Sequence, residues 1–400
     1  MTRPTRSFPD QQSRRARAAV AALFFTNGAL FANLLPRYPE IKASLDLSNT
    51  SFGIAVAAFP VGAMVAGLTA GALIRRFGSA KVAVGGTILT GLGVLLAGVA
   101  PSFAVFALGL FVGGAMDAIT DVAQNAHGLR VQRLYGRSIL NSFHAVWSIG
   151  AVTGGAMAAG AIALHLKLWI HLTISAVVFT VVAIIALRFC LTGPDSAAAT
   201  EGSSEKVGQT IARAAGRPIA VTMAALVLIA VVATMVEDAG NSWAALYLSN
   251  DLGAVASIAA LGYIALTGAQ FIGRLLGDRM VDRFGARTVA RTGGLIVLAG
   301  MGSALAFPSL LGTILGFASA GFGVATLVPA AMHEADELPG LRPGTGLTVL
   351  SWLMRLGFLI SPPLVGLIAD NAGLRAGLLT VPAAGIVVIL LAGVLRAKRR

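Results

Sequence analysis

The chain has 400 residues, of which 56% are hydrophobic and only 12% are charged, and its mean hydropathy is +0.82. A soluble domain has about 45–50% apolar and about 25% charged residues, so this composition excludes one and indicates a membrane protein with several spans. A net charge of +13 would suggest a nucleic-acid partner in a soluble protein. Here the basic residues lie in short segments between apolar runs, as the positive-inside rule requires, and no nucleic-acid partner is predicted.

Residues 1–17 are polar and rich in arginine, and they predict a disordered cytoplasmic tail. A first bundle is predicted over 18–190, where six apolar runs each approach the ~20 residues that a helix needs to cross the hydrocarbon core. These runs lie at about 18–36, 50–73, 82–100, 103–126, 139–164 and 168–190. A polar segment rich in Gly and Ser at 191–216 then predicts a flexible cytoplasmic linker.

A second bundle of six runs is predicted over 217–395, and a basic cytoplasmic tail at 396–400 closes the chain. Most of the 30 Lys and Arg residues fall on the side of the membrane that carries both termini, which the positive-inside rule assigns to the cytoplasm. We therefore predict an all-α, multi-pass protein of the cell inner membrane with twelve spans. The second set lies at about 218–248, 255–276, 288–307, 309–331, 344–369 and 374–395.

The two halves share an internal repeat. The sequence RFG at 76–78 recurs at 283–285, and Gly114 falls on Gly321 at the same offset of 207 residues. A period near half the chain length indicates one structural unit that is repeated in the same direction.

Six spans, a polar loop and six spans in parallel repeat resemble the major facilitator superfamily over essentially the whole chain. The segments at 71–79 and 278–287 are similar to that superfamily's G-x-x-x-D-R/K-x-G-R/K motif, although Arg75 replaces the acid and Asp278 the leading glycine. The resemblance implies a charge network that latches the cytoplasmic helix ends in one conformation. The matching latch residues are Gly71, Arg76, Gly78, Asp282, Arg283, Gly285 and Arg287.

A finer resemblance is to the YbjJ-like branch, a neighbour of the fucose permease group. It is carried by DVAQN at 121–125, by Phe143-His144 and by EDAGNSW at 237–243, with Asp121 where that branch has Glu. The fucose permeases are sugar–proton symporters, so this resemblance implies a sugar-like solute.

Ionisable side chains at membrane depth cost ~2.5–3.5 kcal/mol each and usually serve a pathway. The six clear cases are Asp117, Asp121, His144, Glu237, Asp238 and Arg355. Asp117, Asp121 and Asn125 recur every four residues and predict a polar stripe that faces a wet interior. Asp121 and His144 lie at similar depth, which allows proton exchange between carboxylate and imidazole; a fixed hydrogen bond between two helices is the alternative. The predicted proton-coupling residues are Asp121, Glu237, His144 and Asp117.

Polar residues near the end of the seventh run predict a substrate site. Gly240-Asn241 predicts a helix break that exposes polar groups; the alternative is an interfacial aromatic belt with two solvated acids, which we favour for Tyr247. Arg355 either pairs with one of the acids across a cavity or binds an anionic substrate group. The predicted substrate contacts are Asn27, Asn33, Asn125, Trp147, Asp238, Asn241, Trp243 and Arg355.

No G-x-x-x-x-G-K-[ST] phosphate loop occurs, which argues against an ATP-driven pump within this chain. We predict a proton-coupled symporter of a small polar solute that works by alternating access, with the solute, the proton and the lipid bilayer as partners. A proton-driven efflux antiporter for drugs or metabolites is the alternative, and sodium as the coupling ion stays open. No catalytic or metal constellation stands out, so we expect a monomeric non-enzyme without cofactor or metal.

Overall fold

The computed structural model describes residues 11–136, 139–193, 217–339, 341 and 344–397. Every element assigned within these residues is helical, and twelve helical segments among them are long and apolar enough to cross a membrane. The predicted all-α fold with twelve spans is therefore confirmed. The predictions for 1–10, for 194–216 and for 398–400 concern segments outside the described residues.

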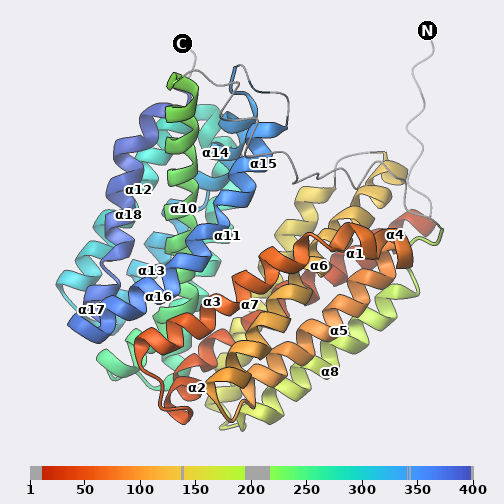
Figure 1. The fold of residues 1–400 in the computed structure, drawn as a ribbon, viewed down its shortest axis with the longest axis horizontal. Helices are drawn as coiled ribbons and strands as arrows, with labels where there is room; N and C mark the ends of the chain where they lie inside the picture. The colour runs from red at the N-terminus through yellow and green to blue at the C-terminus, as the bar shows by residue number, and fades with distance from the viewer. Residues whose placement is uncertain (1–10, 137–138, 194–216, 340, 342–343, 398–400) are drawn as a thin grey trace.

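The first half forms one bundle, with the elements in chain order (Figure 1). They are α1 (Gln11–Ala32), η1 (Leu35–Arg37), α2 (Tyr38–Ser44), α3 (Asn49–Gly67), α4 (Ala70–Phe77), α5 (Ser79–Gly98), α6 (Phe103–Tyr135), α7 (Leu140–Ala163) and α8 (Leu168–Leu187).

The second half forms the other bundle. Its elements are α10 (Arg217–Leu246), η4 (Tyr247–Asp251), α11 (Ala256–Phe284), α12 (Ala286–Ala306), α13 (Leu310–Val324), α14 (Leu327–Asp336), α15 (Thr345–Leu353), α16 (Arg355–Ala372), α17 (Leu374–Gly377), α18 (Thr380–Leu391) and η5 (Ala392–Val394).

Several helices are longer than their apolar runs. Residues 11–17, which we predicted to be a disordered tail, are helical as the start of α1. The helices α6 and α11 continue past 126 and 276 to Tyr135 and Phe284. An apolar run ends where charged residues begin, but the backbone hydrogen bonds of a helix continue through charged residues, because their side chains reach water.

The internal repeat is visible in the backbone. Gly78 and Gly285 occupy the same positive-φ conformation, with φ of 85° and 81° and ψ of 146° and 149°, and each ends one helix and begins the next. Gly114 of α6 and Gly321 of α13 are both close-approach positions, where an added Cβ would clash with the carbonyl oxygen of Phe59 and of Leu266. Phe59 and Leu266 are themselves related by the 207-residue offset. The two halves thus repeat one packing scheme.

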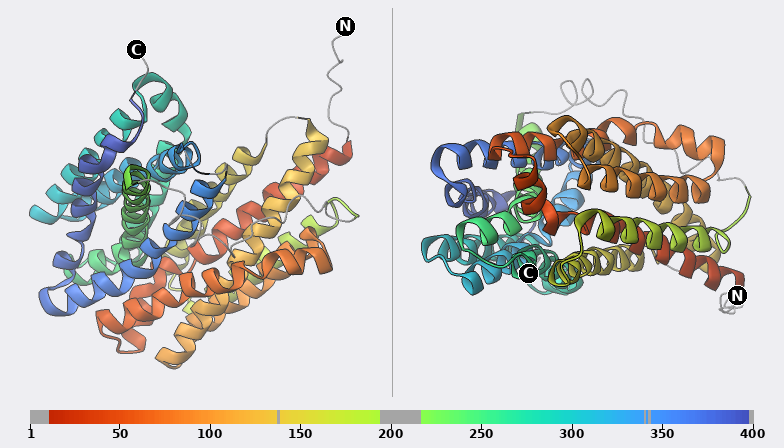
Figure 2. Two further views of the ribbon diagram at one scale, coloured as in Figure 1. Left: turned by 45° about the horizontal axis from the view of Figure 1, so that its top comes forward. Right: turned by 90° about the horizontal axis from the view of Figure 1, so that it is seen from below.

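The halves meet at the end of the molecule formed by α2, the start of α3 and the end of α16, which we call the distal end. There α3 packs along α16, and α7 packs along α11. Toward the opposite end, where α4, α14 and α15 lie, the two bundles diverge (Figures 1 and 2). The helix pairs at the distal end therefore shut one side of the molecule.

Two kinds of contact close the distal end. The Phe52 ring of α3 packs edge-on against the Trp243 ring of α10, with centroids 5.3 Å apart. In addition, a Cβ added at Gly53 would clash with the backbone of Pro362, so α3 and α16 touch through their main chains. Close backbone approach through small residues is the usual way in which membrane helices pack tightly.

Candidate functional site

A polar network joins three helices of the first half. Asn27 of α1 donates from Nδ2 to Asp117 Oδ1 of α6 at 2.7 Å, and its Oδ1 accepts from Trp147 Nε1 of α7 at 2.8 Å. Asn27 is buried, so its amide fixes both partners in place. The structure thereby brings together three residues that the sequence predicted as separate candidates.

The predicted stripe on α6 continues this network by one turn. Asn125 Nδ2 donates to Asp121 Oδ1 at 3.0 Å, and Gln124 Nε2 lies 3.5 Å from both Asp121 Oδ1 and Asn27 Oδ1. His144 of α7 packs edge-on against Phe24 and lies within electrostatic range of Asp121. The proximity of Asp121 and His144 therefore agrees with the depth argument.

Arg355 faces this network from the second half. It is half-buried and is the first residue of α16, directly after Met354, where α15 and α16 adjoin. It interacts electrostatically with both Asp117 and Asp121, and within the described chain no carboxylate oxygen lies within 4.0 Å of its guanidinium. Of the partners considered for Arg355, the two acids of α6 are therefore the ones that the structure places near it.

A second acid site lies in the second half. Glu237 of α10 accepts a hydrogen bond from Gln270 Nε2 of α11 at 2.7 Å, and Arg274 Nη2 of α11 lies 3.6 Å from the same carboxylate oxygen. Arg274 also interacts electrostatically with His144 of the first half. Arg274 thus links the acid of one half to the histidine of the other.

Sequence reasoning missed Gln270 and Arg274. Arg274 lies two residues before the end of the predicted run at 255–276, whereas α11 continues to Phe284, so the structure places this arginine well inside the helix. The available signal was the spacing: Gln270, Arg274 and Asp278 recur every four residues and form a polar stripe like that of Asp117, Asp121 and Asn125.

The predicted break at Gly240-Asn241 is wrong, because α10 continues without interruption to Leu246. The glycine serves packing instead, since an added Cβ would clash with the Leu266 side chain of α11. Asn241 is half-buried on this continuous helix. Tyr247 is 1% exposed, so its assignment to a lipid-facing aromatic belt is also wrong.

Asp238 and Trp243 lie at the shut distal end. Asp238 is buried and accepts a hydrogen bond from Ser242 Oγ at 3.1 Å. Trp243 is fully buried against Phe52 of the first half. In this conformation neither side chain is open to solvent.

Asn33 lies apart from the other candidates. Its Oδ1 is 2.8 Å from His171 Nε2 of α8, and its Nδ2 donates to the Ala29 carbonyl at 2.8 Å. The residue is fully buried with both ends of its amide bonded, which is the arrangement of interhelical hydrogen bonding. His171 is a further buried polar residue that sequence reasoning missed.

The latch residues adopt the same local geometry in both halves. Arg76 and Arg283 each lie over the phenylalanine that follows them, Phe77 and Phe284, at 5.2 and 5.4 Å from the ring centroids. Gly71 and Gly78 are half-buried at the start and the C-cap of α4, and Asp282 is exposed.

Arg287 of α12 binds the C-terminal segment of the chain. Its Nε donates to the Leu395 carbonyl at 3.0 Å, and its backbone N–H donates to the Arg396 carbonyl at 3.1 Å. Arg396 in turn pairs with Glu334 and Glu337 of the same half. The described contacts of Arg287 thus fix the C-terminal segment against α12 and α14.

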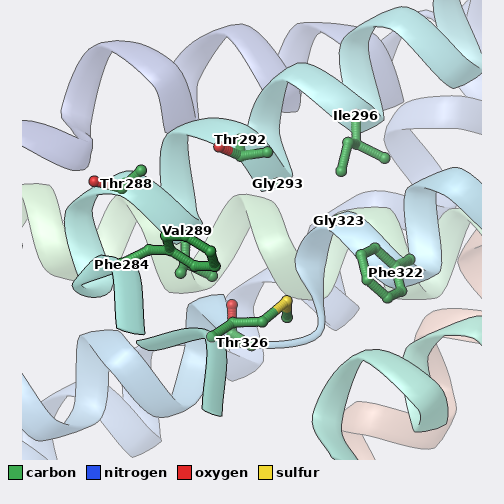
Figure 3. A pocket seen from close by; sticks show the side chains of 10 residues that line it. Phe284, Thr288, Val289, Thr292, Gly293, Ile296, Phe322, Gly323 and Thr326 are labelled. Carbon is green, nitrogen blue, oxygen red and sulfur yellow. The ribbon is translucent and has the colours of Figure 1, made fainter. Parts of the chain in front are cut away.

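Two cavities lie in the second half. One, of about 370 Å³, lies between the end of α11, α12 and α13 and is lined mainly by apolar groups such as Phe284, Ile296 and Phe322 (Figure 3). The other, of about 470 Å³, includes Arg274, Asp282 and Glu334. Within the described residues, no group of three or more His, Cys, Asp or Glu side chains has a metal-binding arrangement.

Twelve spans in two like halves, with half-buried acids and basic groups that interact electrostatically between them, define a membrane transporter built from a parallel repeat. The family model of the Major Facilitator Superfamily matches residues 20–279 and 226–400. The chain belongs to this superfamily.

The similar proteins are transporters. The chain is 28% identical over 377 residues to the "Uncharacterized transporter y4wD" of Sinorhizobium fredii, covering 94% of this chain and 97% of that one. Among solved structures, a mutant of the nucleoside transporter NupG has a TM-score of 0.75 at 11% identity, covering 94% of this chain and 98% of that chain. A D-xylose-proton symporter has a TM-score of 0.69 at 19% identity, covering 95% and 96%. At these identities the two structures establish the fold alone.

Proposed function

We propose that this protein is a proton-coupled symporter of a small, polar, sugar-like solute and that it works by alternating access. The observation that carries the proposal is the pair of electrostatic links across the two halves: Asp117 and Asp121 with Arg355, and His144 with Arg274. Each link joins a group that a proton can neutralise or charge to an arginine that keeps its charge.

Protonation then changes the attraction between the halves. A neutral Asp121 attracts Arg355 less strongly than the carboxylate does, and a charged His144 repels Arg274. Glu237 holds Arg274 from within its own half, so its protonation releases that arginine as well. A proton at either acid therefore acts on the same interface that alternating access must open and close.

The neutral groups beside the acids suit a hydroxyl-rich solute. Asn27, Asn125, Gln124 and Trp147 supply amide and indole groups on three helices. The fold of this chain is also that of a D-xylose-proton symporter and of a nucleoside transporter, which fits solutes of this class.

We further propose that both termini are cytoplasmic, as the distribution of Lys and Arg indicates. The shut distal end then faces away from the cytoplasm, and the diverging ends of the bundles face it. This arrangement corresponds to the conformation that releases an imported solute to the cytoplasm.

The test is solute-driven proton movement in proteoliposomes that contain a trapped pH indicator. The probes are D-xylose, L-fucose, uridine and, for the efflux alternative, ethidium. Symport predicts that one polar probe carries protons in the same direction as itself, and that Asp121→Asn and Glu237→Gln each abolish this proton movement. Asp46→Asn, an exposed acid between α2 and α3, is the matched control and should behave as the parent.

Other outcomes decide against the proposal. Proton movement opposite to ethidium would establish the efflux antiporter instead. Solute uptake that requires a sodium gradient, with no proton movement, would show that sodium is the coupling ion. Unchanged proton coupling in both Asp121→Asn and Glu237→Gln would show that neither residue carries the proton.

A further inference from the structure

A buried carboxylate lies between the two halves at the distal end, and the network described above does not use it. Asp238 is 6% exposed, and its Oδ1 accepts from Ser242 Oγ at 3.1 Å, whereas its Oδ2 has no hydrogen-bond partner among the described residues. The Ser361 hydroxyl of α16, which lies 3.3 Å from the Met235 carbonyl, also interacts with this carboxyl group.

Two further buried polar atoms beside this region have no hydrogen-bond partner in the part of the chain that the structure describes. They are the Tyr38 hydroxyl of α2, from the first half, and the Trp243 Nε1 of α10, from the second. Tyr38 is fully buried and interacts electrostatically with Asp238. The phenyl ring of Phe52 connects them, with its centroid 5.1 Å from that of Tyr38 and 5.3 Å from that of Trp243. We call Tyr38, Phe52, Asp238 and Trp243 the distal gate.

The charges around Asp238 do not favour its ionised form. Glu237, one residue earlier on α10, has the same sign, and Tyr38 is the titratable group that α2 presents. The helix α16 contributes the hydroxyl of Ser361, while Tyr263 and Arg274 of α11 interact with Glu237. Within the described chain no lysine or arginine nitrogen lies within 4.0 Å of Asp238.

A carboxylate that is buried with one oxygen unbonded and no cation nearby is far more costly than the neutral acid. The neutral acid also gains an O–H donor and removes the charge with which Tyr38 interacts. When the halves part at the distal end, water reaches both groups and this penalty disappears. Closure therefore favours uptake of a proton, and uptake of a proton favours closure.

We propose that Asp238 is a proton-controlled gate residue: the distal gate shuts when the carboxyl group is neutral and opens when it is ionised. This role rests on the proposed alternating-access function and adds a proton site distinct from Asp121 and Glu237. It assigns to Asp238 the positioning of the two halves rather than the substrate contact predicted from sequence.

The test measures gate closure directly and uses no solute. The single cysteine is replaced (Cys190→Ser), and spin labels are attached at Ala43→Cys of α2 and Ala372→Cys of α16, which are exposed positions on opposite halves at the distal end. Distance distributions from pulsed electron resonance then give the fractions shut and open as a function of pH.

In the parent, the ratio of shut to open should fall as pH rises, by up to about tenfold per pH unit, as one linked proton requires. Asp238→Asn should stay shut at every pH, whereas Asp46→Asn, which changes an exposed acid between α2 and α3, should retain the pH response. Ser242→Ala keeps the carboxyl but removes its donor, so its response should move to higher pH. If Asp238→Asn does not fold, Ser242→Ala still tests the proposal.

A parent whose shut fraction does not depend on pH, or an Asp238→Asn variant that responds as the parent does, would overturn the proposal. The result is separable from the transport assay, because no solute is present. A pH-dependent gate without proton-coupled uptake would refute only the proposed symport. Proton-coupled uptake with a pH-insensitive gate would refute only the proposed role of Asp238.

Discussion

Asp370 of the second half caps a helix of the first half through Thr50. Its Oδ2 accepts from the Thr50 backbone N–H at 2.8 Å, while its Oδ1 accepts from the Asn49 N–H at 2.9 Å. These are two of the N–H groups that the first turn of a helix leaves without an intrahelical partner. The Ser51 N–H is satisfied within α3 by Ser48 Oγ. The distal end is thus held shut by a helix cap shared between the halves.

Asp370→Ala should weaken the shut state. Loss of a helix N-cap costs ~1 kcal/mol, which is about fivefold in the ratio of shut to open. The labels at Ala43→Cys and Ala372→Cys should report this shift. Asp46→Asn, which removes the charge of another exposed acid at the same end, should leave the ratio unchanged. An Asp370→Ala protein as fully shut as its parent would mean that the cap adds nothing to closure.

Backbone contact between α3 and α16 predicts a steric block. Any side chain at Gly53 meets the main chain of Pro362, whereas Gly67 of the same helix has no heavy atom within 4 Å of an added Cβ. Gly53→Val should therefore prevent full closure, because overpacking costs ~1–3 kcal/mol, and shift the ratio toward open by about tenfold. Gly67→Val is the matched control. The same label pair measures both, and equal ratios in the two variants would contradict the contact.

Much of the fold was predictable because the hydrophobic pattern and the repeat are strong, global signals. The twelve runs gave twelve helical spans. The 207-residue offset placed Gly114 and Gly321 in equivalent packing contacts. Composition cannot show where a helix ends in water, so the predicted run at 255–276 stopped short of Phe284 and left Arg274 near its end.

The candidate site was predictable where spacing alone determines position. Four-residue recurrence on α6 and similar depth predicted that Asp121 and His144 lie near each other, and the structure places them within electrostatic range. The sequence could not reveal which neutral polar residue meets which partner. Asn27 and Asn33 lie six residues apart on the same chain segment, yet one joins the acid network and the other bonds His171. Likewise Gly240 was interpreted as a break, although its role depends on Leu266, which is distant in sequence.

Arg274 should matter for transport more than for stability. Its side chain is 39% exposed and that of Glu237 is 19% exposed, so the pair contributes less than about 1 kcal/mol to folding. Arg274→Gln removes both the partner of Glu237 and the charge that faces His144, so proton-coupled uptake should fall at least about tenfold while the melting temperature changes little. Arg279→Gln, an exposed arginine further along α11, should leave uptake unchanged. If uptake by Arg274→Gln falls only in proportion to a lowered melting temperature, Arg274 has no direct role in transport.

The repeat predicts equal packing costs at equivalent glycines. An added Cβ at Gly114 clashes with the Phe59 carbonyl, and one at Gly321 clashes in the same way with the Leu266 carbonyl. Gly114→Ala and Gly321→Ala should therefore each lower the melting temperature by a similar amount, since overpacking costs ~1–3 kcal/mol. At Gly85 no heavy atom lies within 4 Å of an added Cβ, so Gly85→Ala should be neutral or stabilising by ~0.5–1 kcal/mol through helix propensity. Thermal unfolding in detergent compares the three variants. A large loss at one repeat position with none at the other would show that the halves pack differently despite their shared sequence pattern.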